Sequence, residues 1–231
     1  MRRYLALLVV LSASFAHADS PTKVSVREAL KPLNILVGSW KGTGTPEGTM
    51  EERQKGHWAE TVTWEWQFKG DDAWLTVVFD KGKHFTKGEL RQVEGNKLSF
   101  KVGNSAKETL EYTGELKGKL LVLERKIDGL KLIERLTFSL LHDNRIVYRT
   151  ETKPEAGTLL TKKYQVGLTK EGTPFANVGP SEKDCIVTGG LGTMTVTHEG
   201  KTYYVCCSGC RDEFKANPTK YIAEWEAKRK K

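Results

Sequence analysis

Four cysteines offer the clearest chemistry in this sequence, and the chain has no others. Twenty residues separate Cys185 from Cys206, three separate Cys206 from Cys210, and Cys207 forms a Cys-x-x-Cys pair with Cys210. A cation such as Zn²⁺ or Cu⁺ requires three or four thiolates at one point, and a tight pair with one distant partner supplies them. The spacing therefore predicts one thiolate-bound metal ion, either zinc or copper(I).

Two alternatives use the same cysteines. Four thiols in an oxidising compartment can pair in three ways, although adjacent Cys206 and Cys207 do not easily bridge each other, because a vicinal disulfide is strained. A reversible Cys207–Cys210 disulfide would instead define a thiol–disulfide redox protein. That alternative expects the pair at the head of a helix in a βαβ unit, whereas the preceding residues favour hairpin strands.

The residues around the cysteines resemble a YHS domain, a relative of the TRASH metal-trafficking domain. The resemblance covers roughly residues 180–225 and rests on the runs 184–189, 198–210 and 217–221 together with Phe214. It implies a small ββα module of treble-clef type that binds or senses heavy metal. The implied ligands are Cys185, Cys206 and Cys210, with Cys207 as the usual fourth thiol of the YHS variant.

A hairpin is expected to carry the paired cysteines. Residues 194–197 and 201–205 flank a turn at Glu199-Gly200, and the second strand leads directly into Cys206. His198 and Met194 lie in this hairpin as possible further ligands. The resemblance, however, places only cysteines at the metal.

Two helices are expected to follow. The first helix is expected at residues 211–216, with Cys210 in or just before its first turn. Pro218 is suited to begin the second helix. The amide groups and dipole at a helix N-terminus favour thiolate over thiol, which strengthens metal binding. A module of about fifty residues has too small a core to expect much stability without a metal, disulfides or docking.

The longer N-terminal part, residues 30–170, reads as antiparallel strands. One strand places Trp58, Val62, Trp64, Trp66 and Phe68 on a single buried face. Short Gly- and Asn-containing breaks of the kind found in hairpins separate the strands, so the topology is a meander. Similar alternation recurs at 74–79, 98–102, 110–112, 120–123, 133–140, 146–150 and 164–168.

A meander of eight to ten strands removes its exposed edges by closing into an up-and-down barrel. The run 38–44 has the pattern G-x-W-x-G-x-G after a short helical turn. It resembles the opening of calycin barrels, the lipocalin-like and nitrobindin-like families, in which the tryptophan plugs the closed end. The predicted fold class is therefore mainly β, a calycin-like barrel followed by the small metal-binding module.

The barrel interior has two interpretations. Its large aromatics, such as Trp64 and Trp74, either fill the space or line a cavity for a small apolar ligand. Nitrobindin-like relatives hold haem through a histidine on a late strand, but residues 151–170 contain Tyr164 and no histidine, so no haem is expected. The sequence assigns no residue to ligand binding in the barrel.

No catalytic motif is present, and the protein is not predicted to be an enzyme. The sequence lacks a G-x-S-x-G elbow, H-E-x-x-H, a P-loop and a dinucleotide fingerprint. His57, His84 and His142 are expected to be solvated surface residues. The acidic pairs Glu51-Glu52 and Asp71-Asp72 are expected in solvated loops.

Residues 1–18 read as a secretory signal peptide, so the protein is expected to be exported, either periplasmic or secreted. No later segment is apolar enough for a transmembrane helix. Formal net charge is +8. Removing the two arginines of the signal peptide and the four basic residues at the C-terminus leaves about +2, which does not predict nucleic-acid binding.

The expected organisation is a signal peptide at 1–18, a barrel at 30–170, a Pro- and Gly-containing linker at 171–180, the module at 181–226 and a basic tail at 227–231. Few contacts are expected between barrel and module. The leading hypothesis is an exported heavy-metal-binding protein that holds, senses or hands on a thiophilic ion. The alternatives are a carrier of a small apolar ligand with a zinc-stabilised module, and a thiol redox protein.

Overall fold

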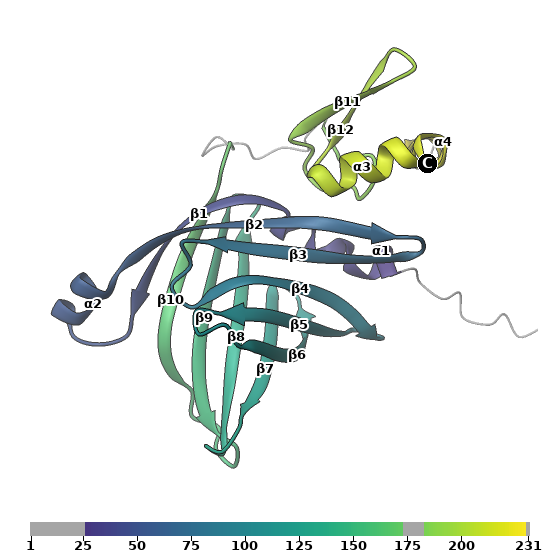
Figure 1. The fold of residues 1–231 in the computed structure, drawn as a ribbon. Coiled ribbons are helices and arrows are strands. Elements are labelled where there is room, and N and C mark those ends of the chain that lie inside the picture. The colour runs from purple at the N-terminus through teal and green to yellow at the C-terminus, as the bar shows by residue number, and fades with distance from the viewer. Residues whose placement is uncertain (1–25, 173–182, 230–231) are drawn as a thin grey trace, which may run out of the picture.

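The computed structural model describes residues 26–172 and 183–229. The expected signal peptide, most of the linker and the last two residues of the tail lie outside this part. Ten strands form a closed antiparallel barrel in which each strand pairs with the next along the chain and the last pairs with the first (Figure 1). The strands are β1 (Gly38–Pro46), β2 (Trp58–Lys69), β3 (Asp72–Asp80), β4 (Phe85–Glu94), β5 (Lys97–Asn104), β6 (Thr109–Lys117), β7 (Leu120–Ile127), β8 (Leu132–His142), β9 (Arg145–Pro154) and β10 (Thr161–Lys170).

The up-and-down order follows from the short turns between strands. Gly70 and Gly118 each have a φ of 59°, the left-handed region that glycine reaches without a Cβ clash, and each begins a two-residue connection. Such connections join only neighbouring antiparallel strands. The topology fits the calycin-like barrel expected from the sequence.

Strand β4 was not expected, because its side chains do not alternate. Only Phe85 and Leu90 are buried along its ten residues, and its pairing with β5 is irregular at two places. A bulge shifts the inward parity of a strand by one residue, so the period-two pattern is lost. The strand is nonetheless required, since β3 and β5 do not pair with each other.

Large aromatic side chains fill the barrel interior. Trp64 is 1 % exposed, and its ring centroid lies 6.0 Å from that of Phe100 and 5.8 Å from that of Phe138. The expected buried face of β2 is confirmed for Val62, Trp64 and Trp66, whereas Trp58 and Phe68 near the strand ends are half-buried. The other large, fully buried aromatics of the barrel are Trp40, Trp66, Tyr112 and Tyr148.

One end of the barrel is closed by the N-terminal segment. Helix α1 (Val26–Leu30) and the 3-10 helix η1 (Lys31–Leu36) precede β1, and α1 contacts β3 and β4. Trp40 is fully buried and its Nε1 donates to the carbonyl of Leu36 at 2.7 Å. The tryptophan of the G-x-W-x-G-x-G run thus joins the first strand to the plug, the helical segment at residues 26–36.

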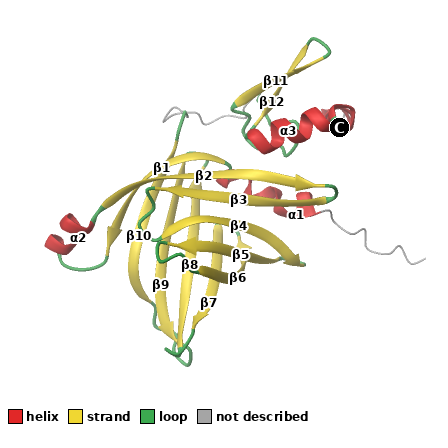
Figure 2. Ribbon diagram, in the orientation of Figure 1, coloured by secondary structure: helices red, strands yellow, loops and turns green. Residues whose placement is uncertain are grey.

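A second helix, α2 (Met50–Gly56), lies at the opposite end of the barrel (Figure 2). Glu51 and Glu52 belong to it, whereas a loop was expected. Thr49 and Glu52 form a capping box, in which each side chain bonds the other's backbone amide. The Thr-x-x-Glu pattern was the local signal for this helix.

The C-terminal part contains a two-stranded sheet and two helices. They are β11 (Met194–His198), β12 (Lys201–Val205), α3 (Ser208–Ala216) and α4 (Pro218–Arg229). The hairpin turn is confirmed at Glu199 and Gly200, whose φ angles of 47° and 75° are those of a tight two-residue turn. Helix α4 continues through 229, so the expected tail at 227–231 begins inside a helix. In the part that the structure describes, no helix is both long and apolar enough to cross a membrane.

Candidate metal centre

Three short segments of the C-terminal part bring the cysteines together. The amide of Cys185 donates to the Gly190 carbonyl at 2.6 Å, and the next amide, from Ile186, donates to Tyr204 of β12 at 2.9 Å. Cys206 and Cys207 follow β12 directly, and Cys210 lies in the first turn of α3. The hairpin therefore aligns the distant cysteine with the paired ones.

The sulfur atoms of Cys185, Cys206 and Cys210 all lie within 4.8 Å of one another. The Sγ atoms of Cys206 and Cys210 are 3.5 Å apart, and all four cysteines are free thiols. Metal–sulfur bonds of about 2.3 Å place the sulfurs of a tetrahedral site about 3.8 Å apart. The three sulfurs have the spacing that one thiophilic ion requires, and their side chains are almost fully buried.

Cys207 is placed differently from the other three. Its Sγ lies 4.0 Å from that of Cys206 but outside the group of three. It accepts a hydrogen bond at 3.4 Å from the backbone amide of Trp66, a residue of barrel strand β2. Of the four predicted ligands, the structure thus gathers three and places the fourth beside them.

Hydrogen bonds between the thiols lower the pKa of two of them and raise the pKa of another. Hydrogen bonding with Cys206, and then with Cys210, lowers the pKa of Cys185 well below its ordinary value and lowers the pKa of Cys207 to about 3. The bonds with Cys185 and Cys207 raise the pKa of Cys206, with that to Cys185 the largest contribution. Cys207 is the N-cap residue of α3, a position where backbone amides favour a thiolate. Cys185 and Cys207 are therefore the two thiols of the cluster that ionise more readily.

Two further side chains adjoin the sulfurs. Thr188 is 1 % exposed and its Oγ1 lies 3.6 Å from the Sγ of Cys206. Lys170, at the end of β10, is buried, and its Nζ lies 5.2 Å from the centre of the Trp40 ring. Burial lowers the pKa of Lys170, while attraction by Cys206 opposes that fall. A barrel lysine thus lies near Cys206.

The other proposed ligands lie outside the group of sulfurs. The ring of His198 packs edge-on against Phe214 at 6.2 Å, and Met194 packs against the core. Among the described residues, the groups that could hold a metal ion include only Cys185, Cys206 and Cys210. An all-sulfur set suits Zn²⁺ or Cu⁺ and suits hard cations poorly.

The barrel contains a buried polar cluster that the sequence interpretation missed. Glu60 is 4 % exposed and accepts hydrogen bonds from the Tyr148 hydroxyl at 2.5 Å and from Trp58 Nε1 at 2.7 Å. Glu60 lies in phase with Trp58 and Val62 on β2, and this parity was the available signal. His84, expected to be solvated, instead stacks on Tyr164 at 3.8 Å, and burial lowers its pKa.

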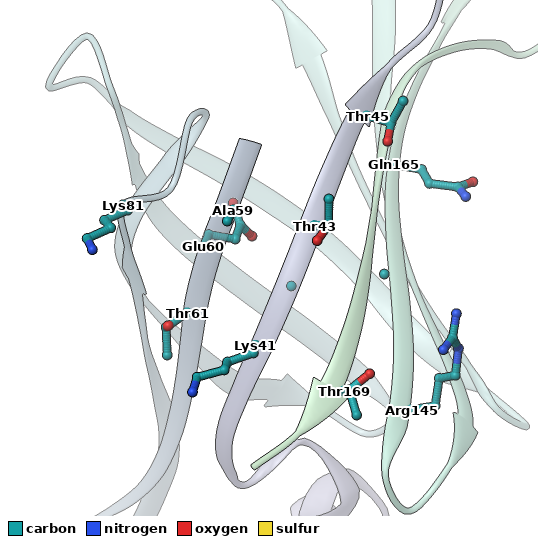
Figure 3. Close-up of a pocket in the computed structure, with 12 residues that line it drawn as sticks. Lys41, Thr43, Thr45, Ala59, Glu60, Thr61, Lys81, Arg145, Gln165 and Thr169 are labelled. Atoms are coloured by element: carbon teal, nitrogen blue, oxygen red, sulfur yellow. The ribbon is translucent and has the colours of Figure 1, made fainter. Parts of the chain in front are cut away.

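A shallow polar groove of about 680 Å³ lies on β1, β2 and β10 (Figure 3). Its side chains include Thr43, Thr61 and Gln165 and the cations Lys41 and Arg145. Lys41 is paired with Glu171 at 2.8 Å. The groove contains no cysteine and is separate from the sulfur cluster.

The fold and the site together define a class of protein: a closed β-barrel followed by a small C-terminal part that contains a buried cysteine cluster. No family model and no curated protein matches the chain. A redesigned beta barrel bound to DFHBI is similar, with 13 % identity over 59 % of this chain and 95 % of that chain and a TM-score of 0.26. The S-type phycobiliprotein lyase from Guillardia theta has 12 % identity over 67 % of this chain and 99 % of that chain, with a TM-score of 0.34.

Proposed function

We propose that this chain is an exported metal-binding protein that holds, senses or hands on one thiophilic ion, Zn²⁺ or Cu⁺. The observation that carries the proposal is the convergence of three buried sulfurs within 4.8 Å of one another. Three thiols buried so close together, with a lysine nearby and no disulfide, suit an ion better than they suit packing alone. The small sheet and two helices around them support the YHS- or TRASH-like assignment.

Two features weigh against the alternatives. A carrier of small apolar ligands needs an interior cavity, whereas fully buried aromatics such as Trp64, Phe100 and Phe138 occupy this barrel. A redox protein based on Cys207 and Cys210 needs one of the two thiols to be accessible to its substrate, whereas Cys207 and Cys210 are both almost fully buried. Export is proposed from the first 18 residues alone, and it would place the thiols in an oxidising compartment, where metal binding protects them.

The test is metal content together with thiol state. The chain from Asp19 onward is purified under anaerobic conditions, and its metals are measured by elemental analysis before and after reloading. We expect about one ion per chain, lost in Cys185→Ser and Cys210→Ser and retained in the neighbouring control Lys215→Ala, which changes an exposed residue of α3. Two intact disulfides and no bound metal in the native protein would reject the proposal.

A further inference from the structure

The cysteine cluster meets the barrel at one unpaired strand edge. The pairing of β1 with β2 ends at Gly38 and Trp64, so beyond that point β3 is the only strand of the described residues that pairs with β2. In an antiparallel strand the N–H and C=O of one residue point to the same side. Trp66 of β2 is paired with Leu75 of β3. The backbone N–H and C=O of Trp66 lie on the side of β2 that faces α3, and α3 lies alongside β2 (Figure 1).

Both backbone groups of Trp66 lie against the small module. Its amide donates to Cys207 Sγ, and a Cβ placed on Gly209 would lie 1.7 Å from its carbonyl oxygen. Gly209 does not have a left-handed φ, so its own backbone does not require glycine. The absence of a side chain at 209 is therefore needed for the close approach of α3 to the barrel.

Three polar contacts join the module to the barrel and its N-terminal segment. Ser208 Oγ donates to Glu65 Oε1 at 2.9 Å, and Asn34 Nδ2 donates to the Thr188 carbonyl at 2.8 Å. At the other end of the module, Arg27 pairs with Glu224 of α4 at 2.7 Å. These contacts differ from the expectation of few contacts between barrel and module, because the projecting end of β2 offers unpaired backbone groups that must be satisfied.

We propose that the barrel regulates the coordination number of the metal centre. While α3 is docked, the Trp66 amide retains Cys207 outside the group of three sulfurs, and the ion is bound by Cys185, Cys206 and Cys210. When the module separates, Cys207 becomes the fourth thiolate. The regulation rests on the proposed function, since it concerns the same metal.

Cys207 Sγ would move only a short distance to become the fourth ligand. Cys207 Sγ is already 4.0 Å from Cys206 Sγ, close to the sulfur spacing of about 3.8 Å in a tetrahedral thiolate site. Loss of the Trp66 hydrogen bond would free Cys207 Sγ to turn toward the ion that its neighbour Cys206 holds. Docking would therefore favour three-coordinate binding, and separation would favour four-coordinate binding.

The test compares Gly209→Ala with Gly167→Ala in the full chain loaded with Cd²⁺. Alanine at 209 meets the Trp66 carbonyl, whereas a Cβ at 167 lies 4.0 Å from its nearest neighbour, the Arg145 side chain. Cadmium X-ray absorption gives the number of sulfur ligands, and hydrogen exchange at the Trp66 amide reports docking. We expect three sulfurs in the wild type and in Gly167→Ala, and four in Gly209→Ala with faster exchange at Trp66.

Cys207→Ser completes the design. Alone it should leave the three-sulfur signal unchanged, and combined with Gly209→Ala it should reduce four sulfurs to three. The double variant Asn34→Ala with Ser208→Ala provides a second way to undock the module without a steric clash. Four sulfurs in the wild type, or three in undocked Gly209→Ala, would overturn the regulation while leaving metal binding intact. Failure of the wild type to bind cadmium would instead overturn the proposed function as well.

Discussion

Asn34, in the plug of the barrel, is hydrogen bonded to the backbone of Thr188, 154 residues later in the chain. Its Oδ1 also accepts from Trp66 Nε1 at 2.9 Å. One amide side chain therefore connects the plug, strand β2 and the segment that carries Cys185. Thr188 in turn contacts Cys206, so the contact leads directly to the sulfur cluster.

Replacing Asn34 by alanine should loosen the small module. The change removes two hydrogen bonds and leaves the Trp66 indole donor without a partner, which costs about 1–3 kcal/mol. Chemical denaturation should show a lower free energy of unfolding, and limited proteolysis should cut the C-terminal part sooner. Asn96→Ala, in an exposed turn, is the matched control. Equal protease sensitivity in the two variants would contradict a docking role for Asn34.

The aromatic core predicts a large difference between two tryptophans. Trp64→Ala removes a fully buried ring between Phe100 and Phe138 and should cost about 3–5 kcal/mol, because a cavity remains. Trp74 lies under the Arg91 guanidinium at 3.9 Å, on the outer side of β3, and its loss should cost about 1 kcal/mol. Urea unfolding of both variants measures the contrast. Similar losses for the two would mean that the barrel interior is not close-packed.

Glu60 predicts a pH dependence of stability. Burial raises its pKa, and the hydrogen bonds from Tyr148 and Trp58 offset this only in part. The folded state therefore keeps this proton to higher pH than the unfolded state does. As pH rises from the unfolded pKa through the folded pKa, the free energy of unfolding falls, and the loss persists at higher pH.

Glu60→Gln should remove that fall. The variant should gain stability relative to the wild type between acid and neutral pH, because an amide does not ionise. Denaturation at several pH values gives the difference, with Glu94→Gln on an exposed strand end as control. A constant difference between wild type and Glu60→Gln across this range would show that Glu60 is not protonated in the fold.

The barrel should fold without the module. Its sheet is closed by pairing of β1 with β10, and neither β11 nor β12, the described strands beyond residue 172, joins it. A protein ending at 172 should keep its far-ultraviolet circular dichroism and cooperative unfolding. It should also exchange the Trp66 amide faster, because Cys207 is absent. An unfolded truncated protein would show that the module is part of the barrel's folding unit.

The isolated C-terminal fragment, residues 178–231, should depend on metal. It buries few large side chains, chiefly Phe214 and Tyr221, so ordering entropy offsets most of the gain from burial. Structural zinc sites contribute about 10 kcal/mol, which becomes folding energy when the metal-free site is unfolded.

Emission from Trp225, the single tryptophan of that fragment, should therefore change when Zn²⁺ or Cu⁺ is added to the reduced, chelated peptide. Acid should reverse the change, because protons compete for the thiolates. The fragment with Cys210→Ser is the control and should not respond. A folded metal-free fragment with unchanged emission would contradict a structural role for the ion.

Local patterns in the sequence predicted most of the elements. Alternation places Val62, Trp64 and Trp66 on one face of β2, because side chains of a strand point to opposite faces in turn. Glu199-Gly200 indicated the hairpin turn, and Pro218 indicated the start of α4, since both act through their own backbone angles. The spacing of the cysteines also indicated which of them could share an ion.

Other features depended on contacts between distant segments. The irregular pairing of β4 removes the two-residue alternation of apolar side chains that identifies a strand. The partial burial of His84 depends on its ring contacts with Trp58 and Tyr164. Cys207 was predicted as the fourth thiol beside the three matching cysteines, yet it accepts a hydrogen bond from the amide of Trp66, which lies 141 positions earlier in the chain. Only the tertiary structure could decide its place, because an unpaired strand edge exists only after β1 and β2 have set their register.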